Sequence, residues 1–201
     1  MKKRTIALVL ALALVVGGAI GGTIAWLTAT TTTITNTFTV GDINIELTES
    51  TGTEYPYIPG KTMEKDPKVT VKSGSENAYV FLKVTVENNV VGDITVIQWA
   101  VANGWNYMVN GVATDANDVD FTMNGTYYFY RTYTKSEADV DYQVLAGGTY
   151  GQVTANSAIT KNQVDTILES TEPTLSFAAA AVQSDNIADL AAAWAARPTG
   201  F

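Results

Sequence analysis

Alternation of apolar and polar residues in short segments constrains the fold of this chain more than any other feature of its sequence. The strongest case is residues 78–86, where one face would carry Val80, Leu82, Val84 and Val86 and the other Tyr79, Phe81, Lys83 and Thr85. A period of two is typical of a β-strand with one face in the core. Residues 42–47 and 68–72 show the same pattern, with inward positions at Ile43, Ile45, Leu47, Val69 and Val71.

Turn signals separate further expected strands. Asn103-Gly104, Asn110-Gly111 and Asn124-Gly125 each lie between β-forming residues. Asn-Gly favours two-residue hairpins because both residues tolerate positive φ. The sequence therefore predicts a meander whose strands cover residues 94–102, 105–109, 119–123 and 126–134. Shorter turns are expected at residues 55–60 and 73–75, which hold Pro and Gly or Ser and Gly.

The last third of the chain adds one or two strands and little helix. Residues 140–145 read as a strand, residues 162–169 as one or two helical turns, and residues 175–182 as a buried strand despite their alanines. A C-terminal helix is expected after Ser184-Asp185-Asn186, which offer N-caps, and should end before Pro198. Its apolar stripe would hold Ile187, Leu190, Ala191 and Trp194. The predicted class is all-β: a jelly-roll-like antiparallel β-sandwich over residues 41–201, with short helical segments, one C-terminal helix and an extended N-terminal strand.

The N-terminus has the layout of a secretory signal peptide. A basic start, Lys2-Lys3-Arg4, precedes an apolar core over residues 6–20, and small residues follow at Thr23 and Ala25. We expect residues 1–25 to be removed by cleavage between Ala25 and Trp26. The alternative is an uncleaved membrane anchor, although the apolar core is shorter than the ~20 residues that a span needs. Contact with a membrane is expected only through the uncleaved signal peptide.

Residues 26–40 contain no charge, no proline and no glycine, and threonine is their commonest residue. β-Branched side chains favour extended structure, and this run lacks the Lys, Pro or inward charge that protects an exposed sheet edge. We expect a strand that is donated to another copy of the protein. Pairing within its own sheet, or a disordered linker, are the alternatives. The donor residues would be Trp26, Leu27, Thr28, Ala29, Thr30, Thr31, Thr32, Thr33, Ile34, Thr35, Asn36, Thr37 and Phe38.

Composition argues against several classes of function. The net charge of −8 disfavours binding to nucleic acid and to anionic membranes. The chain has no histidine, which is the commonest general base and zinc ligand, and no cysteine. No recognisable nucleophile motif is present, so neither an enzyme nor a cofactor is expected.

One acidic segment is the weak candidate for a metal site. Its oxygen ligands would be Asp115, Asn117, Asp118 and Asp120, which resemble the start of a calcium loop. The segment lacks the glycine at the sixth position and the glutamate at the twelfth. We therefore interpret it as a solvated acidic turn and predict no metal.

The signal ends in Gly-Thr-Ile-Ala before an aromatic residue, and the pattern N-x-F-x-x-G-x-L/I-x-L follows at Asn36, Phe38, Gly41, Ile43 and Ile45. In these motifs the chain resembles the TasA and camelysin (CalY) family, secreted Gram-positive proteins that a SipW-type signal peptidase processes. Further similarity covers Ile58-Pro59-Gly60, residues 68–71, Ser73-Gly74-Ser75 with Tyr79-Val80, residues 181–186, and Trp194. Residues 90–170 match poorly.

The resemblance implies a secreted jelly-roll subunit of an extracellular fibre, often in a biofilm matrix. Its mature N-terminal strand would complete the sheet of the next subunit, so the implied partners are identical subunits and the SipW-type peptidase. Camelysins have been classed as metallopeptidases, but this chain has no H-E-x-x-H motif. The alternative is a monomeric cell-surface module that binds carbohydrate or protein through Trp99, Trp105 and the aromatic residues of 126–134.

Overall fold

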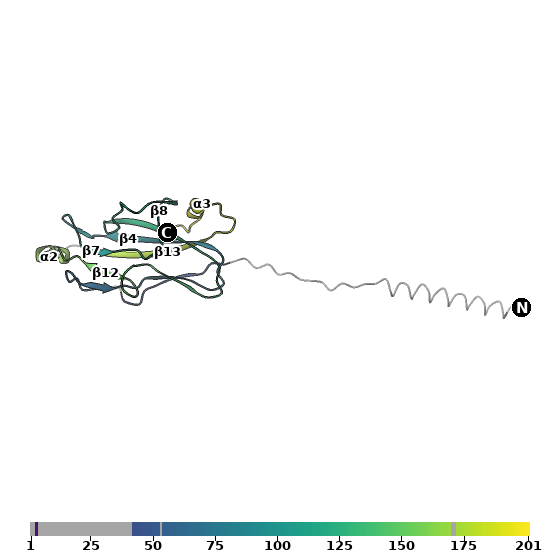
Figure 1. The fold of residues 1–201 in the computed structure, drawn as a ribbon, viewed down its shortest axis with the longest axis horizontal. Helices are drawn as coiled ribbons and strands as arrows, with labels where there is room; N and C mark the ends of the chain where they lie inside the picture. Colours follow the sequence, from purple (N-terminus) through teal and green to yellow (C-terminus); the bar gives the residue numbers. More distant parts are fainter. Residues whose placement is uncertain (1–2, 4–41, 53, 170–171) are drawn as a thin grey trace. The chain divides into compact units, whose positions relative to one another are not determined.

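A computed structural model describes Lys3 and residues 42–52, 54–169 and 172–201 (Figure 1). The chain divides into two units, Met1–Thr39 and Val40–Phe201. Apart from Lys3, the described residues belong to the second unit. The predicted signal peptide, the cleavage site at Ala25 and Trp26, and the predicted donor strand lie outside the described residues.

One layer of the fold is a five-stranded antiparallel sheet. Its strand order is β13 (Thr174–Gln183), β4 (Ala78–Glu87), β10 (Gly125–Tyr133), β8 (Asn106–Val109) and β9 (Val112–Ala113). β4 pairs with β10 over residues 78–86 on one side and with β13 along its whole length on the other, so that Val80 lies opposite Arg131 and Ala181. The predicted strands over 78–86, 126–134 and 175–182 are confirmed, and the last is a strand despite its alanines.

The second layer combines two three-stranded sheets. The first is β1 (Ile45–Thr48), β3 (Lys68–Val71) and β11 (Val140–Gln143), and the second is β2 (Thr62–Glu64), β12 (Gln152–Ala155) and β7 (Ile97–Trp99). A bridge between Val101 and Leu145 links them. β5 (Val90–Val91) and β6 (Ile94–Thr95) form a separate two-stranded hairpin, whose Val91 and Ile94 pack against the core. The predicted all-β sandwich is thus confirmed, whereas β2 and β12 were not predicted.

A single core cluster joins the layers. The inward residues of β4, namely Val80, Leu82, Val84 and Val86, are at most 1% exposed. They share this cluster with Val69 and Val71 of β3, with Ile97 of β7 and with Val153 of β12. Burial of these apolar side chains is the main driving force for folding. The predicted inward positions are confirmed for β3 and β4, whereas Leu47 at the edge strand β1 is 36% exposed.

The predicted meander is only partly correct. Asn110-Gly111 does form the hairpin between β8 and β9, with φ of 50° and 80°. Asn103-Gly104 also turns the chain, but the prediction that its flanking strands pair is wrong, since β7 and β8 belong to different layers. The strand predicted over 94–102 is broken, because residues 94–95 pair with β5 and residues 97–99 with β12.

The strand predicted over residues 119–123 is also wrong. This segment forms turns, in which the Asp120 carboxylate accepts hydrogen bonds from the backbone and hydroxyl of Thr122. Asn124-Gly125 is therefore not a hairpin. The Asn124 side chain instead accepts the backbone N–H of Asn89 at 2.8 Å. Local side-chain hydrogen bonds of Asp and Asn compete with strand pairing in this way.

Two helices complete the described residues. α2 (Lys161–Glu169) lies at one end of the sandwich (Figure 1) and contributes Ile167 to the core. α3 (Leu190–Ala195) starts later than predicted, because Ser184–Asn186 first make a turn and Asp189 is the N-cap. Its buried residues are consequently Ala193 and Trp194, while the predicted stripe residue Ala191 is exposed.

α3 covers the outer face of the five-stranded sheet and forms a second cluster there. Phe81 of β4, Met108 of β8 and Ala180 of β13 pack with Ala193 and Trp194. Gly111, at the tip of the β8–β9 hairpin, lies beneath this helix. A Cβ at Gly111 would lie 2.8 Å from the Cβ of Trp194, so only glycine fits both the close approach and the positive φ.

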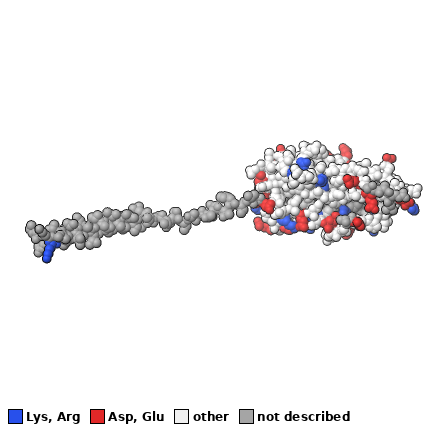
Figure 2. Space-filling view, turned by 180° about the vertical axis from the view of Figure 1, so that it is seen from behind, with Lys and Arg blue, Asp and Glu red and all other residues white. Residues whose placement is uncertain are grey.

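Charged side chains are scattered over the described surface. Figure 2 shows acidic and basic groups interspersed on the face in view, with no basic patch among the residues described there. Ion pairs such as Lys68–Asp141 and Lys72–Glu46 join neighbouring strands at the surface. Such exposed pairs contribute little to stability, because water and salt screen them.

Candidate functional site

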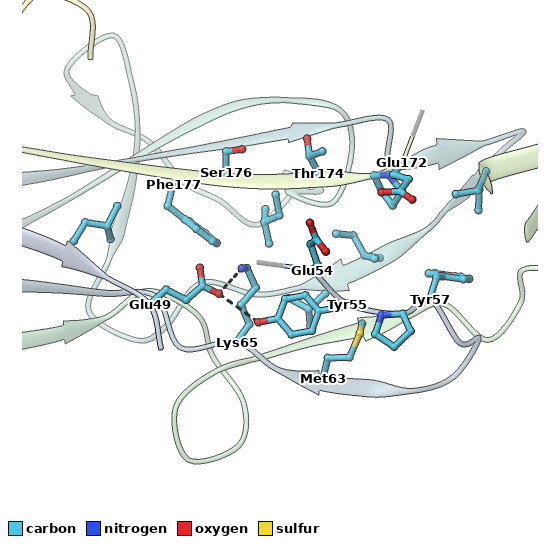
Figure 3. Close-up of a pocket in the computed structure, with 17 residues that line it drawn as sticks. Glu49, Glu54, Tyr55, Tyr57, Met63, Lys65, Glu172, Thr174, Ser176 and Phe177 are labelled. Atoms are coloured by element: carbon cyan, nitrogen blue, oxygen red, sulfur yellow. Dashed lines mark hydrogen bonds and ion pairs between the residues drawn. The ribbon is translucent and has the colours of Figure 1, made fainter. Parts of the chain in front are cut away.

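A groove of about 950 Å³ opens between the first half of β13 and the end of β1 with the segment that follows it (Figure 3). One wall is the first half of β13, Thr174–Phe177, with Glu172 and Pro173 before it. The opposite wall is Leu47 of β1, Glu49 and residues 54–57. The remaining lining is mostly apolar and comes from Met63, Ile97, Val153 and Ile167.

The groove lies between two sheet edges. β1 is the edge strand of its sheet and pairs with β3, and β13 is the edge strand of the larger sheet and pairs with β4. The two strands approach each other, yet within the described residues no strand pairs with the outer edge of either. An unpaired edge presents a row of backbone N–H and C=O groups that another strand can bind.

An ion pair inside the groove is its main polar feature. Lys65 Nζ binds Glu49 Oε1, and their side chains are only 11% and 19% exposed. The ammonium group also lies 5.4 Å from the ring centre of Tyr55 and 5.7 Å from that of Phe177. Figure 3 shows the pair between these two rings. Aromatic faces stabilise a cation in such an arrangement.

Asp66 holds the loop that carries Glu49. Its carboxylate accepts hydrogen bonds from the hydroxyl of Ser50 at 2.5 Å, from the backbone N–H of Ser50 at 2.8 Å and from the N–H and hydroxyl of Thr51, both at 2.9 Å. These bonds, the Ser50 hydroxyl first, hold the pKa of Asp66 far below its usual range. The loop is thereby fixed to the residue that directly follows Lys65.

The lowered pKa of Asp66 predicts a pH-dependent contribution to stability. The contribution is fully present above the unfolded-state pKa of about 4 and is lost as the pH falls below it toward the folded-state value. Replacing Asp66 with asparagine should therefore lower the free energy of unfolding by about 1–2 kcal/mol at pH 7. Urea titrations of both chains at pH 7 and pH 2.5 should show this difference shrinking at the lower pH. A difference that is equal at both values would contradict the assignment.

The acidic segment proposed as a weak metal candidate does not assemble a ligand set. Asp115, Asn117, Asp118 and Asp120 are all exposed. Asp115 accepts two hydrogen bonds from Asn117, and Asp120 accepts two from Thr122. Across the described part of the chain, no three acidic side chains are grouped so that they could hold a metal ion.

The aromatic residues considered as a binding platform are mostly packed inside. Trp99, Trp105, Phe129 and Tyr133 are between 1% and 8% exposed and belong to the core cluster. Trp105 also donates its indole N–H to the carbonyl of Gln143 at 2.8 Å. These rings therefore stabilise the sandwich and do not form a continuous exposed face for a sugar.

The sequence analysis missed the groove and its ion pair. Residues 48–54 and Lys65 lie outside every strand predicted from the sequence. The turn-forming and acidic residues of this segment did not indicate that it lines a groove. The groove depends on which strands are edges, and strand order across a sandwich is not visible in local alternation.

Comparison with protein-family models, with curated proteins and with solved structures found no match to this chain. The resemblance to the TasA and camelysin family therefore stays a prediction. Among the described residues, the helices are too short or too polar to cross a membrane.

Proposed function

We propose that this protein is a secreted structural subunit of an extracellular fibre of the biofilm-matrix type. Each subunit would donate its N-terminal strand, residues 26–38, to the groove of a neighbouring copy. The observation that carries the proposal is the groove beside the edges of β1 and β13, with which no strand of the described residues pairs. The run at residues 26–40 supplies the matching element, since it favours extended structure and carries no charge.

The energetics support a durable joint. A strand laid in the groove can form backbone hydrogen bonds with one of these edges, such as the first half of β13, each contributing about 1 kcal/mol net. Apolar side chains of the strand gain about 25 cal/mol for each Å² that they bury in the groove. Binding costs the conformational entropy of the donated strand and the translational and rotational entropy of the subunit. A groove that already has its binding shape lowers the total cost.

The first test compares a chain that begins at Trp26 with one that begins at Asn36. We expect the longer chain to form filaments in negative-stain micrographs and the shorter chain to remain a folded monomer. Before filaments grow, circular dichroism and thermal melting should be alike for the two chains, because both contain the whole sandwich. Filaments from the shorter chain would contradict strand donation.

A matched pair of variants tests the groove side. Leu47 and Val112 are both exposed apolar residues on edge strands, at 36% and 61%, but only Leu47 lines the groove. Leu47→Arg should stop filament growth, because the long charged side chain blocks the groove, whereas Val112→Arg should leave it unchanged. Equal growth by both variants would place the joint elsewhere.

A further inference from the structure

We propose that Asn36 sets the register of the donated strand by placing its amide on the Glu49–Lys65 ion pair, with Ile34 and Phe38 entering the apolar lining on either side. The inference rests on the proposed function, because it concerns the same groove. It adds the residue that would select one docking position among several.

The donor sequence has two unlike faces. In an extended conformation alternate side chains point to opposite sides. One side would then carry Thr31, Thr33, Thr35, Thr37 and Thr39, and the other Thr32, Ile34, Asn36, Phe38 and Val40. The first face is all threonine and suits solvent. The second is largely apolar and has the only amide of residues 26–40 at its middle.

The groove has a matching pattern. Lys65 and Glu49 lie among Leu47, Phe177 and the apolar lining. A strand that covers them removes both from water, so the free N–H groups of Lys65 and the free lone pairs of Glu49 need partners. An asparagine amide offers both at separate atoms, since its oxygen can accept from Lys65 and its NH₂ can donate to Glu49.

Other registers are less favourable. A shift by one residue turns the threonine face inward, and a shift by two places Ile34 or Phe38 on the ion pair without a hydrogen bond. Charge also restricts the occupant. Glu54 and Glu172 line the groove (Figure 3), and neither forms an ion pair with any described residue. A strand with acidic residues would be repelled, and residues 26–40 contain none.

The absence of cysteine makes the register measurable by disulfide trapping. One chain beginning at Trp26 carries Leu47→Cys on the groove wall. A second chain, of different mass through a tag, carries a single cysteine in place of residue 33, 34, 35, 37 or 38. After mixing and mild oxidation, we expect the mixed disulfide to form mainly at one donor position.

Asn36→Leu in the donor chain should lower the yield at that position about tenfold and spread cross-links to positions two residues away. Thr37→Val, on the opposite face, should keep the pattern. Combining Asn36→Leu with Glu49→Leu and Lys65→Met in the groove chain should restore a single position. An unchanged pattern in Asn36→Leu would overturn this inference alone, whereas no mixed disulfide at any position would overturn the proposed function.

Discussion

Replacing Asn89 with alanine is expected to lower the free energy of unfolding by about 4 kcal/mol, from the loss of several buried hydrogen bonds. Asn89 is fully buried. Its Nδ2 donates to the carbonyls of Ile97 and Thr122 at 2.8 and 2.6 Å, and its Oδ1 accepts the N–H of Ile97 at 2.7 Å. The side chain thus takes the place of a neighbouring strand at the edge of β7. Alanine would leave three backbone groups without these partners.

Urea denaturation followed by circular dichroism at pH 7 measures this loss. Asn117→Ala is the control, because Asn117 is exposed and its side chain bonds only to Asp115 nearby in sequence. It should change the free energy of unfolding by less than about 0.5 kcal/mol. Asn89→Asp should also be destabilising, since a carboxylate cannot donate to the two carbonyls. A loss below about 1 kcal/mol in Asn89→Ala would show that water replaces the side chain.

Replacing Phe81 with alanine should cost a similar amount, about 4 kcal/mol. Phe81 has no exposed surface, and its ring centre lies 5.4 Å from that of Trp194 and 6.5 Å from that of Phe201. The truncation would open a cavity between the five-stranded sheet and α3. Alternation alone gives the opposite expectation, because it places Phe81 on the polar face of its strand, where substitutions have small effects.

Thr85→Ala is the matched control for Phe81→Ala. It lies on the same face of β4 and is only partly buried, so it should change the free energy of unfolding by less than about 1 kcal/mol. Phe81→Leu should retain most of the stability, since it keeps much of the apolar volume. If Phe81→Ala behaved like Thr85→Ala, α3 would not cover the sheet in solution.

The contrast between Val80 and Phe81 shows what residue alternation can predict and what it cannot. Period-two alternation identified the strand and its inward face, because the residues that face the sandwich core are apolar. It could not show that α3, a hundred residues later, covers the other face as well. Strand assignment from residue pattern is local, whereas burial on the second face depends on tertiary contacts.

Two of the three Asn-Gly pairs do not form the predicted hairpins, for a related reason. Asn110-Gly111 forms its hairpin, but Asn103-Gly104 carries the chain from one layer to the other and Asn124 binds Asn89. All three pairs tolerate positive φ equally well, so dihedral preference cannot separate a hairpin from a crossover. The groove was beyond sequence reasoning for the same reason, because its walls come from β1 and β13 at opposite ends of the described chain.

The pairing of β4 with β13 has a consequence for the time course of folding. Each contact in this ladder joins residues roughly a hundred positions apart, and pairs such as Val80 with Ala181 cannot form until β13 has been synthesised. Topologies with so many distant contacts fold slowly, in milliseconds to seconds. The chain loses loop-closure entropy before the distant contacts form and stabilise it. During synthesis the apolar strand β4 therefore has no partner on one side until β13 is made. This interval is when the chain is most exposed to aggregation.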